Sequence, residues 1–163
     1  MVREQEQAAQ PAVRTARSRV QGPIYVPNAA SGRDVQGPAA QPSMFDRLVS
    51  NAKTYLGVPY RFGGSDPKRA MDCSAYVQLI FRSIGIELPR STFGQIKAGN
   101  PVELKDLQPG DLMFFSTDGP GPSHVAVYLG DGQMIHESPP KVQISGISGL
   151  YRQKFYAARR VLP

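Results

Sequence analysis

Apolar residues recur with helical spacing just after residue 43, at i, i+3, i+4 and i+7. This spacing predicts a helix with one buried face. Ser43 and Asp46 form a capping-box-like pair at its start, and Gly57 and Pro59 stop it. The apolar positions of this helix are Met44, Phe45, Leu48, Val49, Ala52, Tyr55 and Leu56.

A second helical pattern begins at Cys73 and stops at Gly85, with Asp72 as a good N-cap. Cys73 lies on the apolar face of this helix, in its first turn. Backbone N–H groups and the positive end of the helix dipole act on a side chain at that position. We therefore expect local structure alone to make the Cys73 thiol more acidic than average and the same N–H groups to be able to hold an oxyanion.

Short apolar runs separated by turn residues follow Gly110 and predict an antiparallel sheet. Helices come first along the chain and strands after, so we expect an α+β fold in which the sheet packs on the cysteine helix. The five runs are 111–116, 124–129, 133–137, 142–145 and 155–162.

The two histidines of the chain, His124 and His136, flank a predicted hairpin, and its register decides whether they meet. With a three-residue loop at 130–132, residue 126 faces 136, and the histidines are diagonal neighbours on one face, about 7–8 Å apart at Cα. A two-residue loop at 131–132 would place them on opposite faces. We predict the three-residue loop, with Gly132 at the left-handed bulge position.

Residues 1–43 are rich in Ala, Gln, Pro, Gly and Ser, and their apolar residues keep no period. We expect a flexible tail or linker that would suit a tether, followed by one compact domain over 44–163. This tail contains no apolar segment typical of a signal peptide.

Composition and charge narrow the function classes. The chain is 40% hydrophobic and 20% charged with a net charge of +6, and it has no apolar run long enough to span a membrane. The positive charge is dispersed and is not interleaved with aromatic residues, so we expect solubility and a bias toward anionic surfaces and no nucleic-acid binding. Cys73 is the single cysteine, which excludes an internal disulfide, and no zinc-binding spacing is present, so we expect no metal and no cofactor.

One cysteine and two histidines are the inventory of a thiol nucleophile with a histidine base and an orienting group. A free thiol is mostly protonated at neutral pH, so an acyl-transfer enzyme needs a base beside it. We predict Cys73 as nucleophile, His124 as base and His136 as the residue that orients it. The competing interpretation of Cys73 is a small buried apolar side chain.

Six sequence blocks in one order resemble the NlpC/P60 family of papain-like cysteine peptidases, and the resemblance is strongest to murein endopeptidases of the Spr/MepS type. It covers about 46–162. The blocks are 57–60 with 63–64, 72–74, 88–92, 107–112, 124–130 and 158–161.

The resemblance implies a hydrolase of peptidoglycan stem peptides that cuts the bond between D-glutamate and meso-diaminopimelate or between diaminopimelate and D-alanine. It implies that Tyr60 lies near the oxyanion and that Asp72 and Ser74 lie near the substrate. Arg90 belongs to a family motif as well, where it would meet a stem-peptide carboxylate or form a structural salt bridge. A monomer in the cell envelope, periplasmic or secreted, is the setting we expect, with a phage tail or an effector as other settings.

Two positions depart from the family pattern. Ala75 replaces a usual glycine and adds a methyl group that would narrow the groove beside the nucleophile. Glu137 replaces a small residue after the second histidine; we interpret it as a charged residue at a strand end, and a carboxylate there would raise histidine basicity.

Two other functions stay open at this point. A related papain-like enzyme could act as an acyltransferase on lipids, although no apolar acyl groove or membrane segment is visible. A peptidoglycan-binding structural component could also use this fold, and the Pro/Gln-rich tail would suit its attachment to an envelope or phage-tail assembly.

Overall fold

The computed structural model describes residues 39–163. Most of the expected tail lies outside these residues, so its character and the domain boundary at 43/44 stay predictions. Helix α1 spans Met44–Lys53 and has the predicted capping box: the Ser43 hydroxyl accepts from the Asp46 N–H, and the Asp46 carboxylate accepts from the Ser43 N–H. The helix ends earlier than predicted, because 54–57 continue as turns.

Helix α2 spans Cys73–Arg82 and begins at the predicted residue, with the Asp72 carboxylate accepting from the Ala75 N–H. It ends three residues before Gly85, which has a φ of 84° and closes the turn after the helix. Three short helical elements were not predicted. They are α3 (Thr92–Gln95), the 3-10 helix η1 (Leu104–Asp106) and α4 (Gly149–Lys154).

A six-stranded antiparallel sheet follows in the order β3-β8-β4-β5-β6-β7, which confirms the α+β prediction and all five predicted strands. Its first edge strand, β3, was not predicted because proline occupies its centre. A small separate hairpin, β1 and β2, precedes α2. The strands are β1 (Ser65–Asp66), β2 (Ala70–Met71), β3 (Asn100–Val102), β4 (Leu112–Phe115), β5 (His124–Gly130), β6 (Gln133–Ser138), β7 (Lys141–Gly146) and β8 (Phe155–Arg160).

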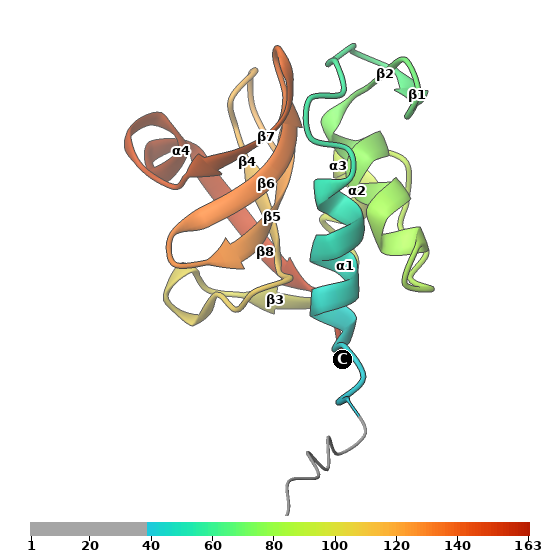
Figure 1. The fold of residues 1–163 in the computed structure, drawn as a ribbon. Coiled ribbons are helices and arrows are strands. Elements are labelled where there is room, and N and C mark those ends of the chain that lie inside the picture. The colour runs from blue at the N-terminus through green and yellow to red at the C-terminus, as the bar shows by residue number, and fades with distance from the viewer. Residues whose placement is uncertain (1–38) are drawn as a thin grey trace, which may run out of the picture. The chain divides into compact units, whose positions relative to one another are not determined.

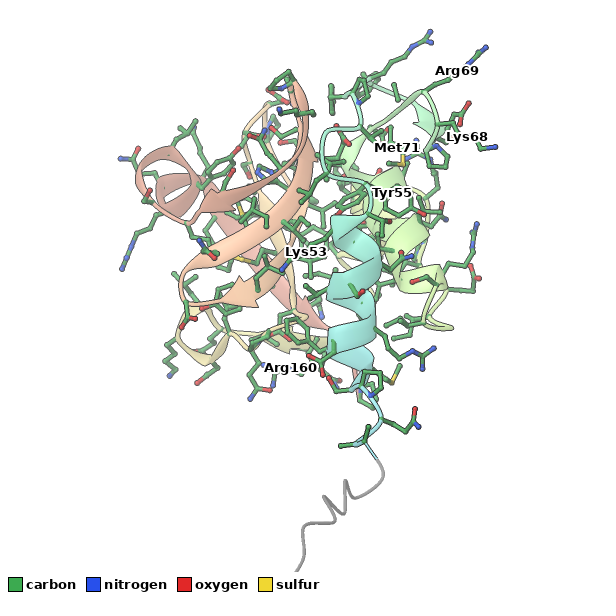
Figure 2. The ribbon with its side chains drawn as sticks, in the orientation of Figure 1. Lys53, Tyr55, Lys68, Arg69, Met71 and Arg160 are labelled. Carbon is green, nitrogen blue, oxygen red and sulfur yellow. The ribbon has the colours of Figure 1, made fainter. Side chains whose placement is uncertain are left out.

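Helices cover one face of the sheet, and α4 lies beyond its other face (Figure 1). The main core fills the space between α1, α2 and the sheet, and a smaller cluster around Phe115 and Met134 lies on the opposite face. In Figure 2, Lys68 and Arg69 extend from the β1–β2 hairpin, whereas Met71 at its base is fully buried in the main core. No helix within 39–163 combines the length and the apolar character that crossing a bilayer requires.

The β5–β6 hairpin has the predicted register by a different route. Asp131 and Gly132 form a two-residue turn with φ values of 51° and 69°, and Gly130 pairs with Gln133. A bulge at Leu129 then shifts the pairing, so that Tyr128 faces Met134 and Val127 faces Ile135. The predicted loop length and the bulge at Gly132 were therefore wrong. The predicted consequence is confirmed, because this register places both histidines on one face.

Candidate active site

Cys73 lies where the helical layer meets the sheet. It is the first residue of α2 and is only 7% exposed. The backbone N–H groups of Val125, Ser74 and Cys73 itself act on its sulfur, and all three lower the pKa of the thiol. Val125 is the neighbour of His124 in β5, so this contact brings the sulfur to the histidine strand.

Burial outweighs these N–H groups and raises the pKa of Cys73 to about 11. The predicted lowering of the pKa by local structure is present, but burial reverses the net shift. The N–H groups at the helix start stabilise the thiolate as expected, but the free-energy cost of removing a thiolate from water is larger than this stabilisation. A neutral thiol at neutral pH needs a neighbouring base to remove its proton during attack.

His124 and His136 come together in the interior of the sheet. Nε2 of His124 and Nδ1 of His136 are 2.8 Å apart, which is a hydrogen bond between the rings. On its far side, Nε2 of His136 is 2.9 Å from Oγ of Ser145 in β7. His136 is fully buried and His124 nearly so. Because Nε2 of His124 is used by His136, only Nδ1 of His124 is free to face the thiol.

Burial also keeps both imidazoles neutral. It lowers the pKa of His124 to about 4, and burial together with the charge of His124 lowers the pKa of His136 to about 3. Aromatic rings from the smaller core cluster enclose the pair: Tyr151 of α4 meets His136 edge-on at 5.4 Å, and Phe115 of β4 lies 6.1 Å from His124. The resting site is a neutral thiol beside two neutral, rigidly packed imidazoles.

A cavity of about 330 Å³ opens over Cys73. Phe62 and Phe93 line it and are 88% and 60% exposed, so two aromatic side chains present their surfaces beside the nucleophile. The cavity combines polar groups with exposed aromatic surface, which suits an amphipathic ligand such as a peptide. Its lining residues are Tyr60, Phe62, Asp72, Cys73, Ser74, Arg90, Ser91, Thr92, Phe93, Asp118 and Ser123.

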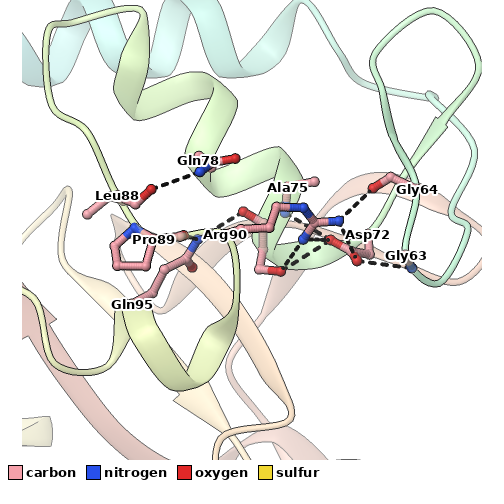
Figure 3. Close-up of polar contacts among 10 residues, drawn as sticks. Gly63, Gly64, Asp72, Ala75, Gln78, Leu88, Pro89, Arg90 and Gln95 are labelled. Carbon is pink, nitrogen blue, oxygen red and sulfur yellow. Dashed lines mark hydrogen bonds and ion pairs between the residues drawn. The ribbon is translucent and has the colours of Figure 1, made fainter.

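Asp72, Ser74 and Arg90, the three predicted substrate-binding residues, line this cavity and form one hydrogen-bonded cluster. Figure 3 shows Arg90 against Asp72 and Gly64. The Arg90 guanidinium donates to both Asp72 carboxylate oxygens at 2.9 Å, to Ser74 Oγ at 2.8 Å and to the Gly64 carbonyl at 3.1 Å. Burial alone would raise the pKa of Asp72, but hydrogen bonds, chiefly from Arg90, hold it below its ordinary value.

Both Asp72 oxygens also accept backbone N–H groups, from Ala75 and from Gly63. The cluster therefore ties the start of α2 to the 63–64 loop and to the segment that carries Arg90. These contacts use the charge of Arg90 within the protein, which favours the structural salt bridge over a contact with a substrate carboxylate.

Tyr60 is held at the cavity by the strand-like segment that follows α1. Its backbone N–H donates to the Pro140 carbonyl, and the residue forms a bridge with Met71. The half-buried ring lines the cavity with Cys73. Burial is the largest cause that raises the pKa of Tyr60, so its hydroxyl keeps its proton and can donate a hydrogen bond.

Glu137 and Ala75 do not have the surroundings that the sequence suggested. Glu137 is fully buried on the face of β6 opposite His136, its carboxyl oxygens have no hydrogen-bond partner within 39–163, and burial with the charge of Asp72 raises its pKa to about 8. It is therefore neither a charged strand end nor a charge that makes the histidines more basic. Ala75 is buried in the main core, so its methyl group does not narrow the groove.

Sequence reasoning missed several residues of the site. Ser145 and Tyr151, which contact His136, come from β7 and from the unpredicted α4, and no local motif marks either of them. Gln95 of α3 is fully buried and donates to the Ser74 and Pro89 carbonyls, which supports the loop that bears Arg90. Among the described residues, no cluster of three or more His, Cys, Asp or Glu side chains is placed to hold a metal ion.

Curated relatives of this chain are named as hydrolases and peptidases. It is 42% identical over 119 residues to the murein DD-endopeptidase MepS/murein LD-carboxypeptidase of Escherichia coli strain K12, covering 71% of this chain and 62% of that one. It is 40% identical over 139 residues to the gamma-D-glutamyl-L-lysine dipeptidyl-peptidase of Bacillus cereus, covering 82% and 40%. A third relative, the gamma-DL-glutamyl hydrolase of Bacillus subtilis, is 43% identical over 97 residues, and the chain spans only 24% of its length.

Solved structures also superpose on this chain, among them an NlpC/P60 protein and a peptidoglycan hydrolase. An NlpC/P60 family protein from Bacillus cereus superposes with a TM-score of 0.67 at 38% identity, covering 75% of this chain and 41% of that one. The peptidoglycan hydrolase RipB of Mycobacterium tuberculosis superposes with a TM-score of 0.65 at 29% identity, covering 74% and 65%. The NlpC/P60 family model matches residues 57–161, which include every residue of the site described above. The chain belongs to the NlpC/P60 family.

Proposed function

We propose that this protein is a peptidoglycan endopeptidase that hydrolyses stem-peptide amide bonds with Cys73, His124 and His136. The observation that carries the proposal is that the buried thiol at the start of α2 lies against strand β5. The first residue of β5 is His124, which is hydrogen-bonded to His136 at 2.8 Å. The names of the relatives supply the substrate class.

In the first half of the reaction, Nδ1 of His124 takes the thiol proton as sulfur attacks the amide carbon. Negative charge develops on the substrate oxygen, where the Cys73 backbone N–H and the Tyr60 hydroxyl donate hydrogen bonds. The C–N bond then breaks, and His124 returns the proton to the departing amine. The product is a thioester between Cys73 and the acyl fragment.

In the second half, water attacks the thioester while His124 takes one of its protons. The thiolate leaves and regains that proton, which restores the neutral resting site. His136 accepts from Nε2 of His124 throughout, so it holds the ring in position and disperses the charge of the imidazolium.

The scissile bond we propose lies next to a diamino acid of the stem peptide, either D-glutamate–diaminopimelate or diaminopimelate–D-alanine. The relatives' names include both a gamma-D-glutamyl and a DD-type specificity, so both bonds belong in the test. We propose that the protein acts outside the cytoplasm, because peptidoglycan lies there. We also propose that it acts as a monomer. The exposed rings of Phe62 and Phe93 would contact the apolar parts of the peptide.

The test is to incubate the parent protein and its Cys73→Ala variant with purified peptidoglycan fragments and to separate the products by liquid chromatography with mass detection. New fragments from the parent alone would support the proposal, and their masses would name the bond. A variant as active as the parent would overturn it.

A parallel assay with phospholipid, with fatty-acid release as its readout, addresses the acyltransferase alternative. A pull-down with sacculi addresses the binding-module alternative. Retention of both proteins on sacculi without cleavage would select the binding module.

A further inference from the structure

Ser145 lies at the end of a chain of polar contacts that joins the two imidazoles. Its Oγ is 2.9 Å from Nε2 of His136, and Nδ1 of His136 is 2.8 Å from Nε2 of His124. The register accounts for this position: Ser145 pairs with Met134 in the β6–β7 ladder, on the face that carries His136. The tautomer of each ring therefore depends on the tautomer of the other ring.

Two arrangements of protons satisfy these contacts. In the first, His124 donates from Nε2 to Nδ1 of His136, and His136 donates from Nε2 to Ser145. In the second, every proton is reversed: His136 carries its proton on Nδ1 and His124 carries its own on Nδ1. Only the first leaves a lone pair on Nδ1 of His124 that can receive the proton of Cys73.

We propose that Ser145 is a positioning residue that accepts the Nε2–H of His136 and thereby stabilises the tautomer in which His124 acts as a base. This inference rests on the proposed function. His136 is fully buried, and Ser145 is the one hydrogen-bond partner of its Nε2 within 39–163, so removing the hydroxyl takes away the acceptor of the Nε2–H. An unpaired buried N–H is costlier than an unpaired lone pair, so its loss favours the reversed, unproductive arrangement.

The surroundings of Ser145 and of the histidine pair support this role. Aromatic rings occupy the other sides of the histidine pair, with Tyr151 edge-on to His136 at 5.4 Å and 6.3 Å from His124. Ser145 itself is partly exposed, so its own O–H can donate to water while its lone pair faces the ring. Ser145 can therefore end the chain of hydrogen bonds without a further buried acceptor for its own O–H.

The first measurement is the tautomer itself. The chain has two histidines, so long-range ¹H–¹⁵N correlation spectra of protein labelled at histidine show two ring systems, and His136→Asn assigns them. We expect both rings of the parent protein as Nε2–H tautomers at pH 7. In Ser145→Ala we expect a shift toward the Nδ1–H tautomers. This readout does not require turnover, so it tests Ser145 separately from the proposed function.

The second measurement is kinetic, on a peptidoglycan fragment. We expect Ser145→Ala to lower kcat by at least roughly tenfold with little change in KM, because the wrong tautomer impairs proton transfer and leaves binding intact. Ser145→Thr keeps the hydroxyl and should stay within about threefold of the parent. Ser148→Ala is the matched control, since this serine precedes α4 and its side chain makes no capping hydrogen bond.

Ser145→Thr and Ser145→Val form a second pair that differs only in the hydroxyl, and they decide the matter if the alanine variant does not fold. Nε2–H tautomers retained in the variants without the hydroxyl would overturn the inference, whatever happens to kcat. A shifted tautomer with an unchanged kcat would overturn it as well. Absence of cleavage by the parent would instead refute the peptidase proposal, and the spectra would still decide what Ser145 does to the rings.

Discussion

The rings of His124 and His136 meet nearly edge-on, with centroids 5.0 Å apart and planes inclined by 72°. This geometry joins one nitrogen of each ring, so that Nδ1 of His124 stays free while Nε2 of His136 contacts Ser145. Two histidines on neighbouring strands thus act as one unit, with a side toward Cys73 and a side toward Ser145.

The two histidines should differ in their effect on catalysis. We expect His124→Ala to lower kcat by roughly 10³-fold or more, because it removes the base itself, and His136→Ala by a smaller factor of roughly 10–10². Stem-peptide cleavage rates measured for both variants check this. Thermal unfolding run alongside separates catalysis from loss of structure. An order of effects opposite to this one would contradict the assigned roles.

Tyr60→Phe tests the oxyanion assignment. Removing the hydroxyl should lower kcat by roughly 10²-fold, the usual effect of losing one oxyanion donor. Stability should hardly change, because the structure records no hydrogen bond from this hydroxyl within 39–163. Tyr156→Phe, at a ring that is 53% exposed on β8, is the matched control and should behave as the parent. Equal kcat values for the two variants would remove Tyr60 from the mechanism.

Glu137→Gln should change how stability depends on pH. Burial raises the pKa of Glu137 to about 8 in the folded protein, against an ordinary value of 4.5. Between these pH values the unfolded chain ionises and the folded chain does not, so the contribution of Glu137 to stability is complete below pH 4.5 and declines as pH rises toward 8. Glutamine has nearly the same shape as protonated glutamate but does not ionise, so the stability of the variant should lack this decline with pH.

Urea unfolding of the parent and Glu137→Gln at pH 5 and at pH 8 measures the difference. We expect the variant to gain at least about 1 kcal/mol on the parent between the two pH values, since each unit of pKa shift is worth about 1.4 kcal/mol. A constant difference between the two proteins across this range would show that Glu137 ionises normally in the folded state.

Arg90→Ala should destabilise the fold by about 1–3 kcal/mol, because it leaves the carboxylate of Asp72, which is only 12% exposed, without its bidentate partner. Arg82→Ala is the control: Arg82 and Glu87 form an exposed ion pair, whose loss should cost less than about 1 kcal/mol. Denaturant midpoints of both variants provide the comparison. Similar midpoints would mean that the Arg90 cluster adds no stability.

Patterns of period 3.6 and 2 were sufficient to predict α1, α2 and five strands. These elements bury one face each, and their apolar spacing follows from that burial. The start of α2 could be located to the residue because Asp72 is a side-chain cap that acts within one turn. Helices of four to six residues, α3 and α4, were missed because they are too short for a period of 3.6 to develop.

Within the site, neighbours in sequence were predictable and partners from distant segments were not. The pairing of His124 with His136 followed from strand register, which is a local property of one hairpin. The ionisation of Cys73 and Glu137 depends on how much water the assembled layers exclude, and no local pattern encodes that. Ser145 and Tyr151 reach His136 from β7 and α4, so only the folded structure identifies them.

The bulge at Leu129 separates the tip of the hairpin from its base. Because one unpaired residue there absorbs the difference in strand length, the count of residues around Asp131 and Gly132 does not by itself determine which face the histidines occupy. Segments of other lengths can replace the tip if an unpaired residue on one strand compensates. The hairpin can therefore acquire new surface at its tip during evolution, or in an engineered fusion, while the spacing of the catalytic rings is preserved.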